Sequence, residues 1–395
     1  MTVTSPSPLD ASRLKLEWTK HPKPTPGPDS PEVLSMKAAT DHMITVSWTS
    51  ARGWDDPKLT PYGPIPVMPS AKAFHYATEA FEGMKVYRGD DGKLRLLRPI
   101  YNCNRMLASA ARISLPSFEP EELRKLIRKL CEIEAPKWLP KNQGGSNLYI
   151  RPSIIGTDDS LGTSAPEEAL LYIFIIHWPT PKTNAPPLRL LSNPETAARA
   201  WPGGTGAAKI GANYGPTIQM LTEAKSLGYD QVLWLFGPDR EITEAGAANF
   251  FVIWRTAEGA LQMVTPPLGG DQTILAGGTR RSILELSRKM FSADRSDEVA
   301  SEAESCEVVE RKITMTEVAQ AAEDNRVQTA FVTGTAYWLQ PVSEILFNGK
   351  TVASPVGQIP HMVLLREKLN NIVYGREPSP WVEVVDENRD LRCIQ

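Results

Sequence analysis

The sequence contains one lysine, Lys209, in surroundings that suit covalent chemistry. It lies in residues 202–216, which read PGGTGAAKIGANYGP, and the glycines and alanines allow the backbone to approach a ligand closely. Small neighbours can exclude water from the amine, and a poorly hydrated lysine loses its charge more easily and becomes a nucleophile suited to Schiff-base formation. The same composition is also typical of an ordinary turn, so the segment by itself leaves both interpretations open.

Two short segments could bind an anion at the end of a secondary-structure element. Residues 277–279, Gly-Gly-Thr, open a predicted helix, whose free N–H groups and positive end attract anions, and the Thr279 hydroxyl adds a donor. Residues 333–336, Thr-Gly-Thr-Ala, end a predicted strand and could aim N–H groups and a hydroxyl at an anion. Both segments are equally typical of an ordinary helix start and an ordinary turn.

Two charged residues are of interest because small or apolar residues surround them. Glu244 lies in residues 242–249, ITEAGAAN, between two predicted strands, so it is either at the surface or paired with a basic side chain. Arg105 interrupts an apolar helix pattern, where a lone arginine usually extends along the helix into solvent. Neither residue defines a reaction by itself.

Several other kinds of catalytic site have no support in the sequence. Ala208 stands directly before Lys209, where a Walker loop has glycine, and the third glycine of a dinucleotide fingerprint is missing from the same stretch. The five histidines include no His-Glu-x-x-His pair, and there is no Gly-x-Ser-x-Gly elbow. We therefore expect neither a catalytic metal nor a serine nucleophile.

The composition of the 395 residues is that of a soluble globular protein. The 43 basic residues nearly balance the 46 acidic ones, and a net charge of −3 argues against nucleic acid as a partner. The longest apolar run, residues 170–178, is far shorter than the roughly 20 residues that a membrane helix needs. The four scattered cysteines and the N-terminal composition favour reduced thiols and a cytoplasmic location, with the mitochondrion as the alternative.

The elements that must position these residues fall on either side of a proline-rich stretch. Residues 1–34 form an N-terminal extension whose many prolines and serines should build no regular element. Residues 35–180 are predicted to form a smaller α/β domain and residues 188–395 a larger domain. Residues 181–187 are the predicted linker, because closely spaced prolines disfavour both helix and strand.

Periodicity and turn signals place the main elements. In the first domain we expect a hairpin around residues 88–92, helices at 99–115 and 119–134, and buried strands at 147–156 and 169–178. In the second domain we expect strands at 188–191, 231–236, 250–254, 261–264 and 328–332, helices at 216–227 and 277–290, a capping box at 314–317 and a hairpin at 345–350. Turns between successive strands favour antiparallel pairing.

Taken together and in order, these segments resemble the branched-chain amino-acid aminotransferases, pyridoxal-phosphate enzymes of fold type IV. The resemblance spans about residues 43–348. It is carried by residues 80–85 (AFEGMK), 104–107 (NRML), 147–152 (NLYIRP), 160–162 (SLG), 209–216 (KIGANYGP), 243–246 (TEAG) and 334–336 (GTA). The resemblance implies a mixed α/β, two-domain fold with a barrel-like antiparallel core in the larger domain, a homodimer, and pyridoxal 5'-phosphate between the domains.

The resemblance also implies a role for each cofactor residue. Lys209 would bind the cofactor covalently and then act as acid and base at the substrate Cα, while Glu244 would face the pyridine nitrogen. Tyr214 would form a hydrogen bond with the phenolic oxygen of the cofactor. The residues implied to hold the phosphate are Arg105, Gly278, Thr279 and Thr335.

The implied substrate pocket must accept both leucine, isoleucine or valine and glutamate. Arg151 beside Tyr149 would suit the side-chain carboxylate of glutamate, and main-chain N–H groups at Thr335 and Ala336 would hold the substrate carboxylate. The other residues implied to line the pocket are Phe81, Thr163 and Ala247, together with Tyr76 and Leu161 from a second subunit.

The sequence departs from the family pattern at positions that bear on substrate choice. Residues 244–249 read EAGAAN where the family commonly has EVGTMN, so Ala247 and Ala248 replace larger residues. Thr163 and Gly278 stand where a valine and a β-branched residue are usual. One methylene changes discrimination by about 1–3 kcal/mol, so these exchanges can shift substrate preference without changing the reaction.

The sequence therefore predicts an aminotransferase that moves an amino group from a branched-chain amino acid to 2-oxoglutarate. One alternative is another fold-type IV pyridoxal-phosphate enzyme, such as a D-amino-acid transaminase, an amine transaminase or an aminodeoxychorismate lyase. A second alternative, from another class, is a paralogue that binds cofactor or a phosphate ligand without turnover.

Overall fold

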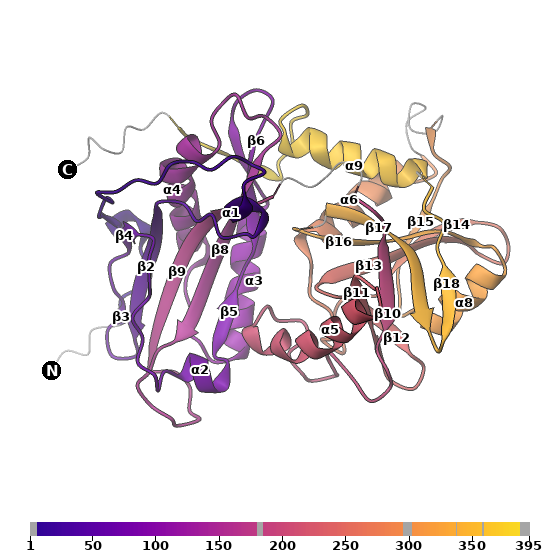
Figure 1. Ribbon diagram of the computed structural model, residues 1–395, viewed down its shortest axis with the longest axis horizontal. Coiled ribbons are helices and arrows are strands. Elements are labelled where there is room, and N and C mark those ends of the chain that lie inside the picture. Colours follow the sequence, from indigo (N-terminus) through magenta and orange to yellow (C-terminus); the bar gives the residue numbers. More distant parts are fainter. Residues whose placement is uncertain (1–5, 180–184, 295–301, 337, 358, 388–395) are drawn as a thin grey trace. The chain divides into compact units, whose positions relative to one another are not determined.

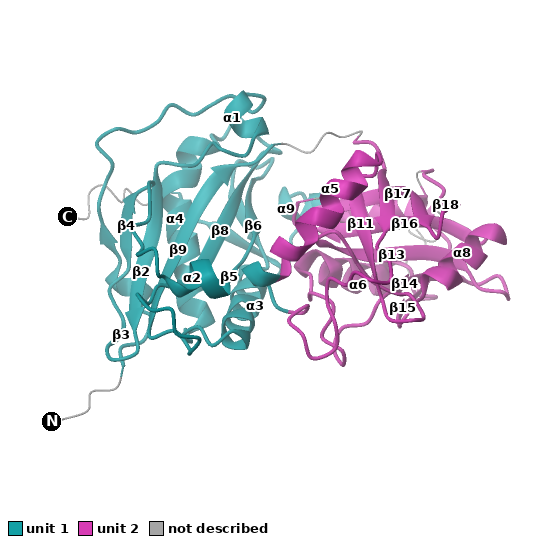
Figure 2. Ribbon diagram, turned by 60° about the horizontal axis from the view of Figure 1, so that its bottom comes forward, with its two compact units in different colours: residues 1–180, 208–212, 370–395 teal, residues 181–207, 213–369 magenta. Residues whose placement is uncertain are grey.

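The computed structural model describes residues 6–179, 185–294, 302–336, 338–357 and 359–387. Two compact units are present, shown in different colours in Figure 2. Unit 1 comprises residues 1–180, 208–212 and 370–395, and unit 2 comprises residues 181–207 and 213–369. Residues 180–184, which include much of the predicted linker, lie outside the described residues, so the domain boundaries stay a prediction.

Unit 1 is built on a 10-stranded sheet. Its main path runs β1 (Lys15–Leu16), β4 (Lys58–Pro61), β2 (His42–Thr49), β9 (Glu168–His177), β8 (Asn147–Gly156), β6 (Met84–Arg88), β7 (Leu94–Leu97) and β19 (Val382–Val385). Two short strands lie off this path, β3 (Gly53–Trp54) on β2 and β5 (Glu79–Phe81) on β8. The pairing is antiparallel except between β1 and β4, and the predicted hairpin around residues 88–92 is confirmed as β6 and β7.

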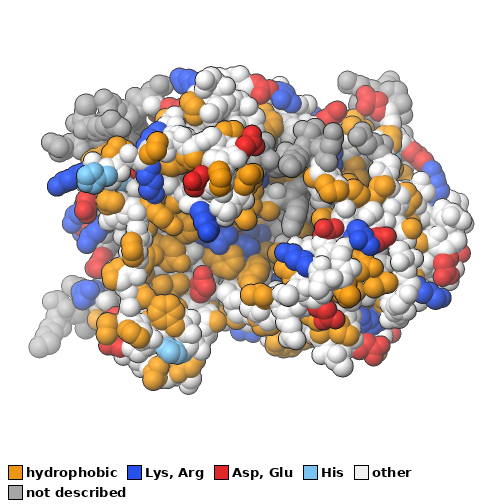
Figure 3. Space-filling view, viewed as in Figure 1, with side chains coloured by type: hydrophobic (Ala, Val, Ile, Leu, Met, Phe, Trp, Pro, Cys, Tyr) orange, Lys and Arg blue, Asp and Glu red, His pale blue; other side chains and the backbone are white. Residues whose placement is uncertain are grey.

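One face of this sheet packs against two helices, α3 (Pro99–Arg112) and α4 (Pro120–Trp138), as Figure 1 shows. Side chains alternate along a strand, so Leu148 and Ile150 of β8 enter the core with Leu123 and Ile127 of α4. The same alternation directs Tyr149 and Arg151 to the opposite face of the sheet. On that face apolar side chains gather, with Lys or Arg side chains beside them (Figure 3).

The prediction that residues 1–34 build no regular element is wrong. The segment contains a 3-10 turn (Ala11–Arg13), the strand β1 and the short helix α1 (Pro31–Leu34), and α2 (Lys72–Tyr76) follows later in the unit. Leu9 and Val33 are buried, and β1 pairs in parallel with β4. Composition failed here because the partner of this segment lies far along the chain, where a local pattern cannot show it.

Unit 2 contains a 9-stranded sheet that closes on itself. Its strands are β10 (Leu188–Ser192), β11 (Gln231–Phe236), β12 (Glu241–Ala245), β13 (Ala248–Arg255), β14 (Leu261–Thr265), β15 (Glu307–Glu310), β16 (Val327–Gly334), β17 (Trp338–Phe347) and β18 (Lys350–Ala353). The order β12, β11, β10, β17, β16, β13 returns to β12, because β12 pairs with both β11 and β13. This ring is the predicted barrel-like core, although β10 is parallel to both of its neighbours.

Unit 2 also contains the helices α5 (Ile218–Ser226), α6 (Gly278–Met290) and α8 (Met315–Glu323), and the helix α9 (Pro360–Val373) begins in unit 2 and ends in unit 1. The predicted capping box is confirmed, since the Thr314 hydroxyl accepts from the Glu317 N–H and the Glu317 carboxylate accepts from the Thr314 N–H. Sequence patterns missed β12, so Glu244 lies within a strand and not between two strands. None of the helices in the described residues is long and apolar enough to span a membrane.

Candidate active site

Lys209 belongs to a short segment that packs with unit 1. Its main-chain N–H donates to Ser109 Oγ of α3 at 2.8 Å, and its carbonyl accepts from the Phe81 N–H at 3.0 Å. The next residue, Ile210, forms an isolated β-bridge with Ala80 of β5. The lysine backbone is therefore fixed on two sides, and the half-buried amine lies 4.8 Å from the centroid of the Phe81 ring.

Arg105 forms an ion pair that the sequence interpretation did not include. Its Nε and Nη2 atoms donate to the two carboxylate oxygens of Glu82 at 2.6 and 2.7 Å, and Asn102 donates to the same carboxylate at 2.8 Å. Burial would raise the pKa of the fully buried Glu82 carboxyl, but Arg105, the charge of Lys209 and the Asn102 hydrogen bond together outweigh burial and hold this pKa below its ordinary value. The guanidinium is thus held against a carboxylate and does not simply extend into solvent.

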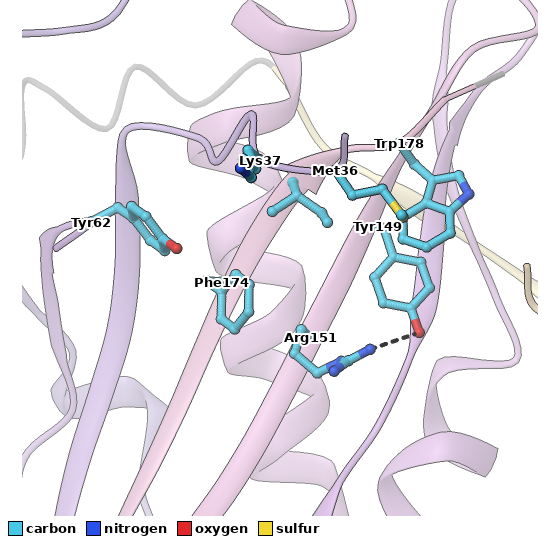
Figure 4. A pocket seen from close by; sticks show the side chains of 8 residues that line it. Met36, Lys37, Tyr62, Tyr149, Arg151, Phe174 and Trp178 are labelled. Carbon is cyan, nitrogen blue, oxygen red and sulfur yellow. Dashed lines mark hydrogen bonds between the residues drawn. The ribbon is translucent and has the colours of Figure 1, made fainter. Parts of the chain in front are cut away.

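The predicted substrate residues of β8 lie together on the face of the sheet opposite α3 and α4. The Arg151 guanidinium lies 4.8 Å from the Phe81 ring centroid and 5.3 Å from the Tyr149 ring centroid, and its Nη2 donates to the Tyr149 hydroxyl at 3.3 Å (Figure 4). Trp178 stacks on Tyr149 with ring centroids 4.6 Å apart. A Cβ atom at Gly83 would lie 1.8 Å from the Tyr149 hydroxyl, so only glycine fits there.

The residues expected to come from a second subunit are exposed in unit 1. Tyr76 ends α2 and is 39 % exposed, and Leu161 lies in the loop between β8 and β9 and is 63 % exposed. The Tyr76 hydroxyl donates to the Leu161 carbonyl, so the structure brings these two residues together. Thr163, two residues further along the same loop, is also exposed.

Glu244 is buried in unit 2 with a basic partner, which confirms the second of the two sequence alternatives. Its Oε2 lies 2.7 Å from Arg199 Nη2, and its Oε1 accepts from the Leu275 N–H at 3.2 Å and from the Asn249 amide at 3.3 Å. Both side chains of the ion pair are at most 4 % exposed. Sequence reasoning missed Arg199 and Asn249. The one available signal was an acid among small apolar residues, which suggests burial and therefore a basic partner.

The N-terminus of α6 has the features of an anion site. Its N-cap residue is Gly277, which supplies no side-chain cap, and Thr279 in the first turn is only 6 % exposed. A Cβ atom at Gly277 would lie 2.1 Å from Asn249 Oδ1, so this position also requires glycine. Free N–H groups, the helix dipole and the Thr279 hydroxyl, with Gly278 between, suit a phosphate.

The remaining predicted residues of unit 2 occupy loops beside these strands. Thr335 and Ala336 follow β16 and are half-buried, whereas the Thr333 hydroxyl is buried without a hydrogen-bond partner among the described residues. Ala247 is exposed in the turn between β12 and β13, and the buried Ala248 lies 3.8 Å from the position that a Cβ at Gly334 would take. Tyr214 is half-buried at the start of the 3-10 turn Gly215–Thr217.

Comparison with known families gives the class of protein. The family model described as amino-transferase class IV matches residues 79–345 of this chain. The chain belongs to this family.

The curated relatives belong to one narrower group within this family. Over 380 residues the chain is 41 % identical to the mitochondrial branched-chain-amino-acid aminotransferase of Bos taurus, covering 95 % of this chain and 92 % of the relative. It is 42 % identical to the cytosolic enzyme of Mus musculus, with 91 % and 89 % covered, and 41 % identical to the cytosolic enzyme of Saccharomyces cerevisiae, with 96 % and 99 % covered.

Solved structures agree on the fold. A branched-chain aminotransferase from Thermoproteus uzoniensis aligns with a TM-score of 0.63 at 24 % identity, covering 87 % of this chain and all of that chain. The corresponding enzyme from Escherichia coli aligns with a TM-score of 0.65 at 21 % identity, with 86 % and 99 % covered. At these identities the likeness establishes the fold.

Proposed function

We propose that this protein transfers the amino group of leucine, isoleucine or valine to 2-oxoglutarate, giving the branched 2-oxo acid and glutamate. The observation that carries this conclusion is a half-buried lysine, fixed at both backbone polar groups, in a chain that matches branched-chain-amino-acid aminotransferases over nearly its whole length. The alternatives from the sequence, another fold-type IV enzyme and a non-catalytic paralogue, lack such support.

The residues present fit pyridoxal 5'-phosphate. An uncapped helix start with a buried threonine suits the phosphate, and a buried carboxylate that is ion-paired keeps the negative charge that a protonated ring nitrogen requires. When bound, the cofactor supplies an electron-withdrawing ring that stabilises the charge left on the substrate Cα after loss of its proton. Gly278, Thr279, Thr335 and Arg105 would hold its phosphate, Glu244 its ring nitrogen and Tyr214 its phenolic oxygen.

Lys209 would attach to the cofactor in the resting enzyme and, once displaced by substrate, would carry the proton at the substrate Cα. A neutral amine takes this proton, and the resulting ammonium returns it in the second half of the reaction. The Phe81 ring beside the amine would shield one side of it from water and would tolerate the ammonium through its π face. The fixed backbone on either side of Lys209 limits where the amine can move.

Substrate would be oriented by both of its ends. The N–H groups of Thr335 and Ala336 would bind the α-carboxylate, and the rings of Phe81 and Tyr149 would contact the branched side chain. Arg151 would meet the second carboxylate of glutamate or 2-oxoglutarate. Thr163 and Ala247 would shape the outer part of the side-chain pocket.

We propose a homodimer in which Tyr76 and Leu161 of one protomer complete the site of its partner. The support is that both side chains are exposed in unit 1, although large apolar side chains are usually buried, and that the Tyr76 hydroxyl donates to the main-chain carbonyl of Leu161. Light scattering would test this assembly, and Leu161→Asp should shift the mass toward the monomer. An unchanged dimer would remove Leu161 from the contact.

The compartment proposed is the cytosol, which is where the relatives from Mus musculus and Saccharomyces cerevisiae quoted above are placed. The relative from Bos taurus is mitochondrial. Cell fractionation with antibody detection decides between the two.

The proposed reaction is tested with purified protein that has been loaded with pyridoxal 5'-phosphate. Leucine alone should bleach the yellow colour of the enzyme, and leucine with 2-oxoglutarate should yield glutamate. No bleaching with leucine, isoleucine or valine would contradict branched-chain transamination. Bleaching with D-alanine or a simple amine instead would favour the fold-type IV alternative.

A further inference from the structure

A cavity of about 340 Å³ opens over β8 and β9, on the face of the unit 1 sheet opposite α3 and α4 (Figure 4). The residues that line it are Met36, Lys37, Tyr62, Tyr149, Arg151, Phe174, Ile176 and Trp178. Most of these side chains are aromatic or aliphatic, and Met36 points toward Trp178 and Tyr149. The walls therefore suit an apolar group of a few carbon atoms.

The charged groups of the cavity are both cationic. Lys37 and Arg151 carry positive charge, and none of the lining residues is an acid. Within the described part of the chain, the Lys37 amine has no ion-pair or hydrogen-bond partner, and Arg151 forms one hydrogen bond, to Tyr149, while its Nε atom is buried and unpaired. Lys37 is exposed and Arg151 is half-buried, and together they make the cavity electropositive, which favours an anionic ligand.

One acid, Glu79, interacts with the charge of Arg151 from outside the lining of the cavity, but among the described residues no ion pair joins the two side chains. Burial raises the pKa of the Glu79 carboxyl, and the charge of Arg151 lowers it only in part. Glu79 lies on β5 and is not among the residues that line the cavity. Arg151 thus keeps the capacity to bind a ligand carboxylate.

The main chain at Lys37 is held by hydrogen bonds to the backbone of the N-terminal extension. Its N–H donates to the Glu32 carbonyl at 2.8 Å, and the Met36 N–H donates to the Val33 carbonyl at 2.9 Å. Met36 has φ 58°, a left-handed conformation that costs a residue with a side chain roughly 1 kcal/mol and needs support from its surroundings. That support includes the fully buried Val33 and the bridge from Ala39 to Ile176 of β9.

The cavity adjoins the reacting lysine through one aromatic ring. Arg151 and the Lys209 amine each lie 4.8 Å from the centroid of Phe81. A substrate whose Cα is next to Lys209 would direct its side chain past Phe81 toward Arg151, and a longer side chain would reach the region between Arg151 and Lys37.

We propose that Lys37 is a specificity-determining residue that, together with Arg151, binds the second carboxylate of 2-oxoglutarate and glutamate. This inference rests on the proposed function. The aromatic walls accept a branched apolar side chain, and the two cations accept a carboxylate, so one cavity serves both substrates of the exchange. Lys37 should contribute little to the binding of a substrate whose side chain is apolar.

The variant that tests this proposal is Lys37→Met, because methionine keeps the length of the side chain and removes its charge. We expect KM for 2-oxoglutarate to rise by roughly 3- to 10-fold, the effect of one partly exposed charge pair, with kcat nearly unchanged. Exchange between leucine and 3-methyl-2-oxobutanoate, in which neither substrate has a second carboxylate, should keep its KM and kcat. Lys37→Arg should restore KM for 2-oxoglutarate.

Lys58→Met is the matched control, since Lys58 is an exposed lysine of β4 in the same unit and does not line the cavity. An unchanged KM for 2-oxoglutarate in Lys37→Met would overturn the proposal, and so would an equal rise in KM for both classes of 2-oxo acid. Failure of the proposed function looks different, because the unaltered protein would then catalyse neither the leucine exchange nor the reaction with 2-oxoglutarate.

Discussion

At the scale of residues, the proposed chemistry depends on the amine of Lys209, whose backbone is held by neighbours distant in sequence. Ser109 and Phe81 hold its backbone, and the Phe81 ring separates it from Arg151. A second pair, Glu82 and Arg105, supports the predicted phosphate contact from inside unit 1. Each of these residues has a role that a single substitution can test.

Lys209→Ala should reduce transamination of leucine by at least about 1,000-fold, because the variant lacks the group that we propose carries the proton at Cα. The variant should still fold, as the hydrogen bonds at position 209 use the backbone. Circular dichroism and a coupled glutamate assay check both expectations. Near-normal activity would remove Lys209 from the mechanism.

Glu82→Gln should lower the free energy of unfolding by about 3 kcal/mol, because it leaves the Arg105 guanidinium without its buried counter-ion. Affinity for pyridoxal 5'-phosphate should fall as well, since Arg105 loses the carboxylate that orients it. Denaturant unfolding and cofactor titration measure the two effects.

Glu121→Gln is the control, because Glu121 pairs with Arg124 on the surface of α4. This variant should lower the free energy of unfolding by under about 1 kcal/mol. Equal losses in the two variants would contradict the proposed role of Glu82.

At the scale of elements, the side-chain amide of Asn249 links strand β12 to the residues just before helix α6. Asn249, at the start of β13, donates to Glu244 of β12 and to the carbonyl of Leu275 just before α6. Its Oδ1 atom occupies the space that a side chain at Gly277 would need. The carboxylate and the predicted phosphate site are therefore coupled by local packing within unit 2.

Gly277→Ala should displace the Asn249 amide and weaken both sites. We expect a loss of about 1–3 kcal/mol in the free energy of unfolding, the usual cost of overpacking, with weaker cofactor binding. Gly357→Ala provides the comparison, because no atom lies within 4 Å of the Cβ it would add. If the two variants bind pyridoxal 5'-phosphate equally well, the coupling through Asn249 is wrong.

At the scale of the whole molecule, the stability of the fold is affected by a charge that is buried on the face of the unit 1 sheet opposite α3 and α4. Lys85 of β6 lies beside Tyr149 in the strand register, is only 5 % exposed, and its amine lies 6.0 Å from the Trp178 ring centroid. It has no ion-pair partner among the described residues. Burial lowers the pKa of Lys85 from its ordinary value to about 8.

This pKa predicts a pH dependence of global stability. Below pH 8 the amine is charged in both the folded and the unfolded chain, so folding bears the full cost of burying the charge. Between pH 8 and the ordinary value of 10.5 the folded chain loses the proton while the unfolded chain keeps it, and the free energy of unfolding rises.

Lys85→Met should therefore be more stable than the parent at pH 7, by on the order of 2 kcal/mol, with the difference shrinking as pH rises above 8. Denaturant unfolding at a series of pH values measures this, and Lys58→Met should show no such trend. A difference that stays constant from pH 7 to pH 10 would contradict a buried, charged Lys85.

The sequence by itself determined the reaction class, through the ordered set of motifs in residues 80–336 that resembles one family, and it determined most of the local structure through local patterns. A lysine among glycines, the helix start at Gly277 and the capping box at Thr314 are local patterns, and periodicity located strands such as β11 because alternation is a property of neighbouring residues. Only the tertiary structure decided which residues support them. Arg199 meets Glu244, Ser109 meets Lys209 and Lys37 meets the cavity of Arg151 through contacts between distant segments. Such contacts follow from strand pairing and packing, which no local pattern encodes. For the same reason, neither β1 nor the regular structure within residues 6–34 was predicted.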